Sequence, residues 1–114
     1  MQENLCSVCH GFIHEGQSFL PSDAEVDALA EFFTVLGSPT RLKILLALDG
    51  GELCAGHLAQ AVGMAPSAVS NQLKALKAAR MISVRREGKM LFYSLADCHP
   101  RAIIRLAMSH VSEE

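Results

Sequence analysis

Apolar residues recur at helical spacing in the first third of the chain. Ser22 and Glu25 form the S-x-x-E pattern of a capping box, in which each side chain binds the backbone N–H of the other residue. Gly37 is the kind of residue at which helices commonly end. The apolar positions between these signals are Val26, Leu29, Ala30, Phe33 and Leu36. The pattern predicts a helix over residues 22–36.

Two shorter helices are predicted over residues 38–63. In SPTRLKILLALDGG, Ser38 is a suitable cap, Pro39 occupies the first helical position and a Gly-Gly pair ends the run. The segment ELCAGHLAQAVG predicts a further helix that ends at its last glycine. This helix offers two side chains to the core, Leu58 and Val62.

Pro66 opens a helix with one apolar and one polar face, PSAVSNQLKALKAAR. At helical spacing, three large apolar side chains fall together: Val69, Leu73 and Leu76. The opposite face carries small polar groups and a cation: Ser67, Ser70, Asn71 and Lys74. We therefore expect the apolar face to join the core and the polar face to remain outside.

The last third of the chain predicts a β-hairpin followed by a helix. ISVRR and KMLFYSL are rich in β-branched and aromatic residues, and a tight turn at Glu87-Gly88 joins them. A last helix is expected over residues 100–111. Helix, short turn, helix and then a hairpin with a basic tip is the order of a winged helix-turn-helix, so we expect a mainly α fold with a β-hairpin wing.

The size and composition of the chain indicate one compact domain. With 114 residues, half of them hydrophobic, the chain is long enough for a core. We expect residues 1–21 to form an N-terminal arm and residues 22–114 to form the DNA-binding and dimerisation domain. No stretch approaches the roughly 18 apolar residues of a membrane span, and the first residues lack the pattern of a signal peptide, so we expect a cytoplasmic protein that has no membrane partner.

Charge is distributed unevenly along the sequence. Residues 1–40 hold six acids and no Lys or Arg, whereas residues 66–92 hold six bases and one acid. A basic segment of this kind is typical of a nucleic-acid contact, although a solvated basic face is the alternative. The candidate DNA-binding residues are Ser67, Ser70, Asn71, Lys74 and Lys77 on the predicted helix, and Arg85, Arg86 and Lys89 on the wing.

Four segments resemble, in order and spacing, the ArsR/SmtB family of metal-responsive winged-helix repressors: GSPTRLKILLAL, ELCAGHLAQAVG, SAVSNQLKALKAARMI and RREGKMLFYSL. The resemblance implies a homodimer, built through its terminal helices, that occupies double-stranded operator DNA without metal and releases it when metal binds. It implies control of metal efflux or sequestration genes. Arsenic-sensing members carry paired cysteines in the ELC segment, whereas Ala55, Gly56 and His57 follow Cys54 here, which argues against arsenite.

The predicted C-terminal helix carries ligand-type residues on one side. His99 and His110 are separated by about 16 Å along a helix axis, so one chain cannot close a zinc site with both. If two copies pack their last helices antiparallel, Asp97 and His99 of one chain meet His110 and Glu113 of the other. This set resembles the C-terminal zinc site of the family and favours Zn(II). The alternative is that the two histidines only flank an apolar dimer interface.

The stretch CSVCH contains Cys6, Cys9 and His10, and His14 follows it. The stretch is compatible with haem attachment, a metal-binding arm, a redox dithiol or a tail without a function. A cytosolic location argues against haem. The resemblance implies a second type of site, in which N-terminal ligands meet the cysteine of the ELC segment. Cys54 and His57 are one helical turn apart and can face one ion, so Zn(II), Cd(II) or Pb(II) would suit this set.

Two other classes of function compete with metal sensing. A thiol redox or persulfide sensor on the same fold would use a pair of cysteines to alter its affinity for DNA. An enzyme acting on a small organic substrate is disfavoured, because the sequence contains no glycine-rich phosphate loop and no nucleophile arrangement.

Overall fold

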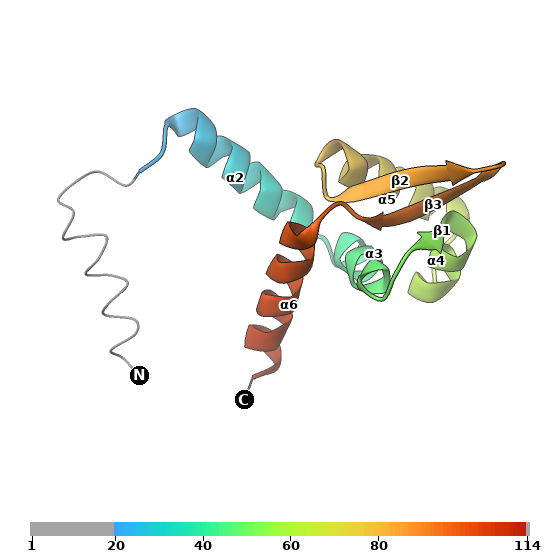
Figure 1. Cartoon of the computed structure of the whole chain (residues 1–114). Coiled ribbons are helices and arrows are strands. Elements are labelled where there is room, and N and C mark those ends of the chain that lie inside the picture. Colours follow the sequence, from blue (N-terminus) through green and yellow to red (C-terminus); the bar gives the residue numbers. More distant parts are fainter. Residues whose placement is uncertain (1–19, 114) are drawn as a thin grey trace. The chain divides into compact units, whose positions relative to one another are not determined.

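The computed structural model describes residues 20–113 and separates the chain into two compact units, residues 1–30 and 31–114. Helix α2 (Asp23–Leu36) contributes to both units. None of the helices within residues 20–113 is long and apolar enough to cross a membrane. The second unit holds the remaining elements, in the order α3 (Pro39–Asp49), β1 (Leu53–Cys54), α4 (Ala55–Val62), α5 (Pro66–Ala78), β2 (Ile82–Glu87), β3 (Met90–Leu95) and α6 (Cys98–Ser112) (Figure 1).

The predicted helix signals act as expected at several helix ends. The Ser22 hydroxyl accepts a hydrogen bond from the Glu25 backbone N–H at 3.2 Å, and the Ser22 N–H donates to the Glu25 carboxylate at 3.0 Å, so the capping box is formed. Ser38 caps α3 by accepting from the Arg41 N–H. Gly63 ends α4 in the left-handed conformation, with φ of 69°, which a residue with a side chain adopts only at a cost.

The sheet has three antiparallel strands in the order β1-β3-β2, one more strand than the sequence predicted. Leu53 and Cys54 were expected to belong to a helix, but they are extended and pair with Tyr93 and Phe92 of β3. Two residues are too few to produce an alternating pattern, and only the pairing with a distant strand reveals β1. The last helix also starts two residues earlier than predicted, because the Asp97 carboxylate accepts from the His99 N–H at 2.8 Å and caps it.

The core lies between α3, α4, α5 and the hairpin. Leu58 of α4 is fully buried as predicted, whereas Val62 is only partly buried. In α2, the buried residue is Val35, and Phe33 of the predicted apolar stripe remains 56% exposed. The apolar face of α5 is buried as predicted. The largest fully buried side chains are Ile44, Leu45, Leu48, Leu58, Val69, Leu76 and Met81.

A carboxylate at the end of α3 holds α6 in place. Asp49 accepts a hydrogen bond from Nε of Arg101 at 2.7 Å and from Nε of Arg105 at 3.0 Å. The two arginines are four residues apart, so they lie on the same side of α6. Hydrogen bonds from Arg105 and Arg101 lower the pKa of Asp49 below its ordinary value of 3.8.

We expect the Asp49→Asn substitution to destabilise the fold at neutral pH. Because the pKa of Asp49 is lowered in the folded chain, its ion pairs stabilise the fold above pH 3.8 and are lost as the pH falls through the lowered value. The unfolding temperatures of the parent and of Asp49→Asn should therefore differ most at neutral pH and converge in acid. Glu31→Gln, at the exposed surface of α2, is the control. A constant difference at all pH values would contradict the assignment.

Candidate nucleic-acid interface and metal ligands

Helix α5 is the second helix of the helix-turn-helix and presents a polar face. Val69, Leu73 and Leu76 are at most 3% exposed, which fixes the rotation of the helix about its axis. The predicted contact residues are all exposed: Ser67, Ser70, Asn71, Lys74 and Lys77. A helix of this kind fits the major groove, where hydroxyl and amide groups reach base edges and lysines reach phosphates.

A hydrogen bond that the sequence did not predict fixes α5 to α3. Nε of Arg41, in the first turn of α3, donates to Oε1 of Gln72 at 2.9 Å, and both residues are partly buried. Gln72 lies next to Asn71, so the bond holds the helix at the position from which base edges would be read. Arg41 was not singled out from the sequence, because only the packing of α3 on α5 brings the two residues together.

The wing contains one cation that is already paired. Arg85 was predicted to contact phosphate, but its Nε and Nη2 donate to the Glu52 carboxylate at 2.7 and 2.9 Å, and its Nη1 donates to Glu87 at 3.0 Å. Its guanidinium carbon also lies 4.8 Å from the centre of the Phe92 ring. The hydrogen bonds from Arg85 lower the pKa of Glu52, so both partners carry their charges at neutral pH.

The other two predicted wing cations, Arg86 and Lys89, are exposed. Both lie toward the turn of the hairpin, since Arg86 pairs with Leu91 near the end of β2 and Lys89 lies in the turn itself. Their position at the tip suits contact with the phosphates beside the groove that α5 would enter.

The predicted C-terminal metal ligands lie on α6 or beside its ends and are all exposed: Asp97, His99, His110 and Glu113. Asp97 Oδ1 and His99 Nδ1 are 3.4 Å apart, which brings two of the four together. Both contacts of the Asp97 carboxylate, with the His99 backbone N–H and with the His99 imidazole, are made by Oδ1. Leu106, on the same side of the helix, is 74% exposed. The carboxylates and imidazoles fit Zn(II) by their chemistry.

Cys54 and His57 form a second pair of potential ligands. Cys54 Sγ and His57 Nδ1 are 3.4 Å apart, with the thiol buried and the imidazole at the surface. The two side chains are therefore close together, and their binding of one ion stays a prediction. Within residues 20–113, no three His, Cys, Asp or Glu side chains gather where they could hold an ion. The arm ligands expected to join this pair, Cys6, Cys9, His10 and His14, lie outside the described residues.

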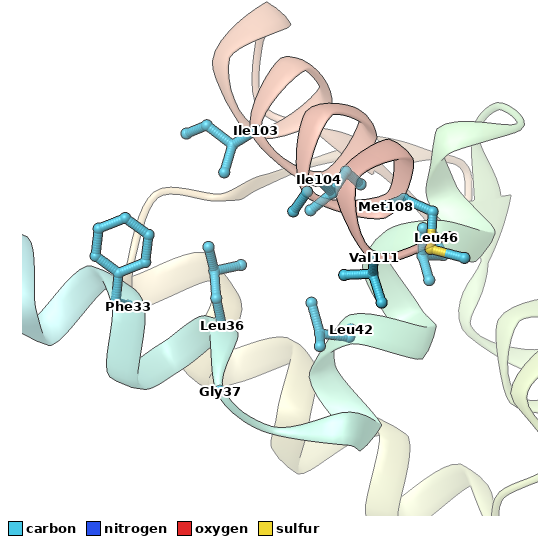
Figure 2. Close-up of a pocket in the computed structure, with 10 residues that line it drawn as sticks. Phe33, Leu36, Gly37, Leu42, Leu46, Ile103, Ile104, Met108 and Val111 are labelled. Atoms are coloured by element: carbon cyan, nitrogen blue, oxygen red, sulfur yellow. The ribbon is translucent and has the colours of Figure 1, made fainter. Parts of the chain in front are cut away.

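An open apolar groove runs between the end of α2, α3 and α6, with a volume of about 490 Å³. Figure 2 shows side chains of all three helices pointing into this space. Several of them are exposed, and Phe33, Met108 and Val111 are 56%, 52% and 75% accessible. The residues that line the groove are Phe33, Leu36, Gly37, Leu42, Leu46, Ile103, Ile104, Ala107, Met108 and Val111.

Comparison with known proteins gives consistent matches. Residues 38–84 match the family described as "Bacterial regulatory protein, arsR family". A transcriptional repressor SmtB homolog from Synechocystis is 40% identical over 89 residues, which is 78% of this chain and 67% of that protein. A cadmium resistance regulatory protein, a CadC homolog from Staphylococcus aureus, is 31% identical over 99% of this chain and 96% of its own length.

Similar structures have also been solved. A homodimeric winged helix-turn-helix DNA-binding domain from Mycobacterium bovis, a possible ArsR-family regulator, matches with a TM-score of 0.75 and 30% identity. The match covers 84% of this chain and 92% of that one. The expected winged helix-turn-helix fold is thus confirmed.

We expect Asn71→Ala to reduce sequence discrimination, because an amide on the outer face of α5 can bond an adenine edge. The ratio of affinities for a preferred duplex and one altered at a single base pair should fall by about five- to a hundredfold. Fluorescence anisotropy with both duplexes measures this ratio. Ser70→Ala should act in the same direction.

Lys74→Ala is the matched control on the same face. Since a lysine bound to phosphate carries no sequence information, this variant should weaken binding to both duplexes equally and reduce the slope of log affinity against log salt by about 0.9. Equal weakening of both duplexes by Asn71→Ala would contradict its role in reading bases.

Proposed function

Because the chain belongs to the ArsR family of bacterial regulatory proteins, which are DNA-binding regulators and not enzymes, we propose that it is a metal-responsive transcriptional repressor. It binds operator DNA as a homodimer in the cytoplasm and releases it when Zn(II), or else Cd(II) or Pb(II), binds. Its targets are genes for metal efflux or sequestration. The observation that carries the proposal is the set of exposed ligand-type residues on α6 or at its ends, Asp97, His99, His110 and Glu113, on a helix that also lines an uncovered apolar groove.

Operator binding would use α5 and the wing of each chain. The polar face of α5 enters the major groove, and Arg86 and Lys89 neutralise phosphates beside it. Two chains related by a twofold axis would meet successive major grooves about 34 Å apart, so the operator is expected to be roughly palindromic.

The apolar groove supports dimerisation through the terminal helices. Phe33, Met108 and Val111 expose apolar surface that a small domain normally buries, and a second copy would cover it. The same packing brings the last helices of two chains together. This matters for the metal, because His99 and His110 of one chain are too far apart to bind the same ion.

The C-terminal site would then be completed by two chains, with Asp97 and His99 from one and His110 and Glu113 from the other. A zinc ion bound there would hold the two chains in a fixed relative orientation. That orientation sets the distance between the two α5 helices, so an ion that shifts it weakens binding to the operator. Metal and DNA become coupled ligands, and each lowers the affinity for the other by the same factor, typically about 5- to 150-fold.

The short Cys54–His57 contact supports a second candidate site. A thiolate and an imidazole 3.4 Å apart, joined by donors from the N-terminal arm, would suit Cd(II), Pb(II) or Zn(II). The alternative function, thiol redox or persulfide sensing, would use a pair of the chain's cysteines instead. The two functions differ in their dependence on α6, since a redox response should survive the loss of its acid and histidine ligands.

The test is zinc-induced release of operator DNA by a His110→Ala variant that still dimerises and still binds DNA. Because His110 would complete the site of the other chain, we expect the variant to stay on DNA at free zinc concentrations that release the parent. Cys54→Ser is the matched variant of the second site and should retain release by zinc. Anisotropy of a labelled operator in a zinc buffer series measures both.

The opposite pattern would assign control to Cys54 and the arm. If His110→Ala releases DNA at the same free zinc as the parent, the C-terminal site does not drive release. If the response survives the loss of Asp97, His99, His110 and Glu113, and an oxidant or a persulfide donor releases DNA where zinc does not, the redox alternative is correct.

A further inference from the structure

An ion pair reaches across the sheet from β2 to the residue that precedes β1. In the order β1-β3-β2, Arg85 of β2 pairs with Phe92 of β3, and Phe92 pairs with Cys54 of β1. Glu52 directly precedes β1. The Arg85 side chain therefore lies over the ring of Phe92, 4.8 Å from its centre, and reaches Glu52 beyond the central strand.

The contacts of Arg85 are poorly suited to holding a phosphate. Nε, Nη1 and Nη2 each donate to a carboxylate, at 2.7, 3.0 and 2.9 Å. With Glu52 and Glu87 both ionised, the three side chains together carry one negative charge. A phosphate would have to displace at least one of these carboxylates. Within residues 20–113, Arg86 and Lys89 of the wing form no ion pair, and they lie farther toward the tip than Arg85.

The pair connects the wing to the start of the helix-turn-helix. Helix α4 begins at Ala55, three residues after Glu52, and its first turn follows β1 without a break. The two short hydrogen bonds from the Arg85 guanidinium to the Glu52 carboxylate form a fork, which restricts both the distance between the two groups and their relative direction. Movement of the hairpin relative to α4 and α5 would therefore break the fork.

We propose that Glu52 and Arg85 are positioning residues for DNA binding. They fix the wing relative to the helix-turn-helix so that Arg86 and Lys89 meet the duplex while α5 occupies the groove. This inference rests on the DNA binding described above and assigns Arg85 a role other than that of a phosphate ligand. An acidic residue thereby promotes binding to a polyanion.

The test compares the operator affinity of Glu52→Gln, Arg85→Lys and Arg86→Ala over a series of salt concentrations. Glu52→Gln removes a negative charge near DNA, so simple electrostatics predicts tighter binding, whereas loss of the fork predicts binding weaker by roughly two- to fivefold. Arg85→Lys keeps the charge but cannot form the fork, and should weaken binding with an unchanged salt slope. Arg86→Ala, the matched control, should reduce that slope by about 0.9.

Two outcomes would overturn the proposal. Unchanged or tighter operator binding by Glu52→Gln shows that the ion pair does not position the wing. Parent-like binding by Arg85→Lys, together with a reduced salt slope for Arg85→Ala, makes Arg85 a phosphate ligand. Thermal unfolding followed by circular dichroism shows whether a variant is folded at the assay temperature. If a single variant is unfolded, the charge-swapped double variant Glu52→Arg with Arg85→Glu replaces it. Recovery of affinity by the swap supports positioning, and no recovery opposes it.

A second measurement separates this inference from the proposed function. Amide hydrogen exchange without DNA should be faster in β2 and β3 of Glu52→Gln than in the parent, and unchanged in α5. Unchanged exchange in the hairpin overturns the wing-positioning role even if DNA binding is established. Failure of the parent to bind any duplex overturns the function, whatever the exchange shows.

Discussion

Helix α3 buries Ile44, Leu45 and Leu48 completely and packs against α4, α5, α6 and β3. These three side chains are completely removed from water and belong to the core that packs the helices against the hairpin. Polar contacts at the two ends of α3 then orient the neighbouring helices α5 and α6. Arg41 near its start bonds to Gln72 of α5, and Asp49 at its end binds both arginines of α6. The helix expected to read DNA and the helix that carries the histidines are thus both fixed to one rigid element.

Local patterns were sufficient to predict most of the fold and the exposed face of α5. The spacing of Val69, Leu73 and Leu76 determines which side of α5 is buried, and therefore which side remains for DNA. The same reasoning missed β1, because two residues give no period. It also treated Arg85 as a free cation. Its partner Glu52 is 33 residues away and becomes a neighbour only through strand pairing, so the local sequence contains no signal for the pair.

The two candidate metal sites lie at structurally different places. Cys54 is the residue before α4, and its backbone pairs with β3, so an ion bound by Cys54 and His57 would act where the wing meets the helix-turn-helix. The predicted ligands at the C-terminal end lie on or next to α6, which also lines the apolar groove, and an ion bound there would act on the relative orientation of two chains. Metal binding at Cys54 and His57 would therefore change the structure within one chain, whereas metal binding at the C-terminal site requires two chains.

If a second copy covers the groove between the end of α2, α3 and α6, as proposed above, the stability of the fold depends on the protein concentration. A chain that buries this surface only against a second copy gains stability by mass action, so its resistance to unfolding rises with its own concentration. At a few copies per cell, a larger fraction of such a regulator would be monomeric, and degradation of the monomer would compete with dimerisation. DNA that binds two chains at once would then act as a stabiliser of its own repressor, and released chains would be the ones turned over.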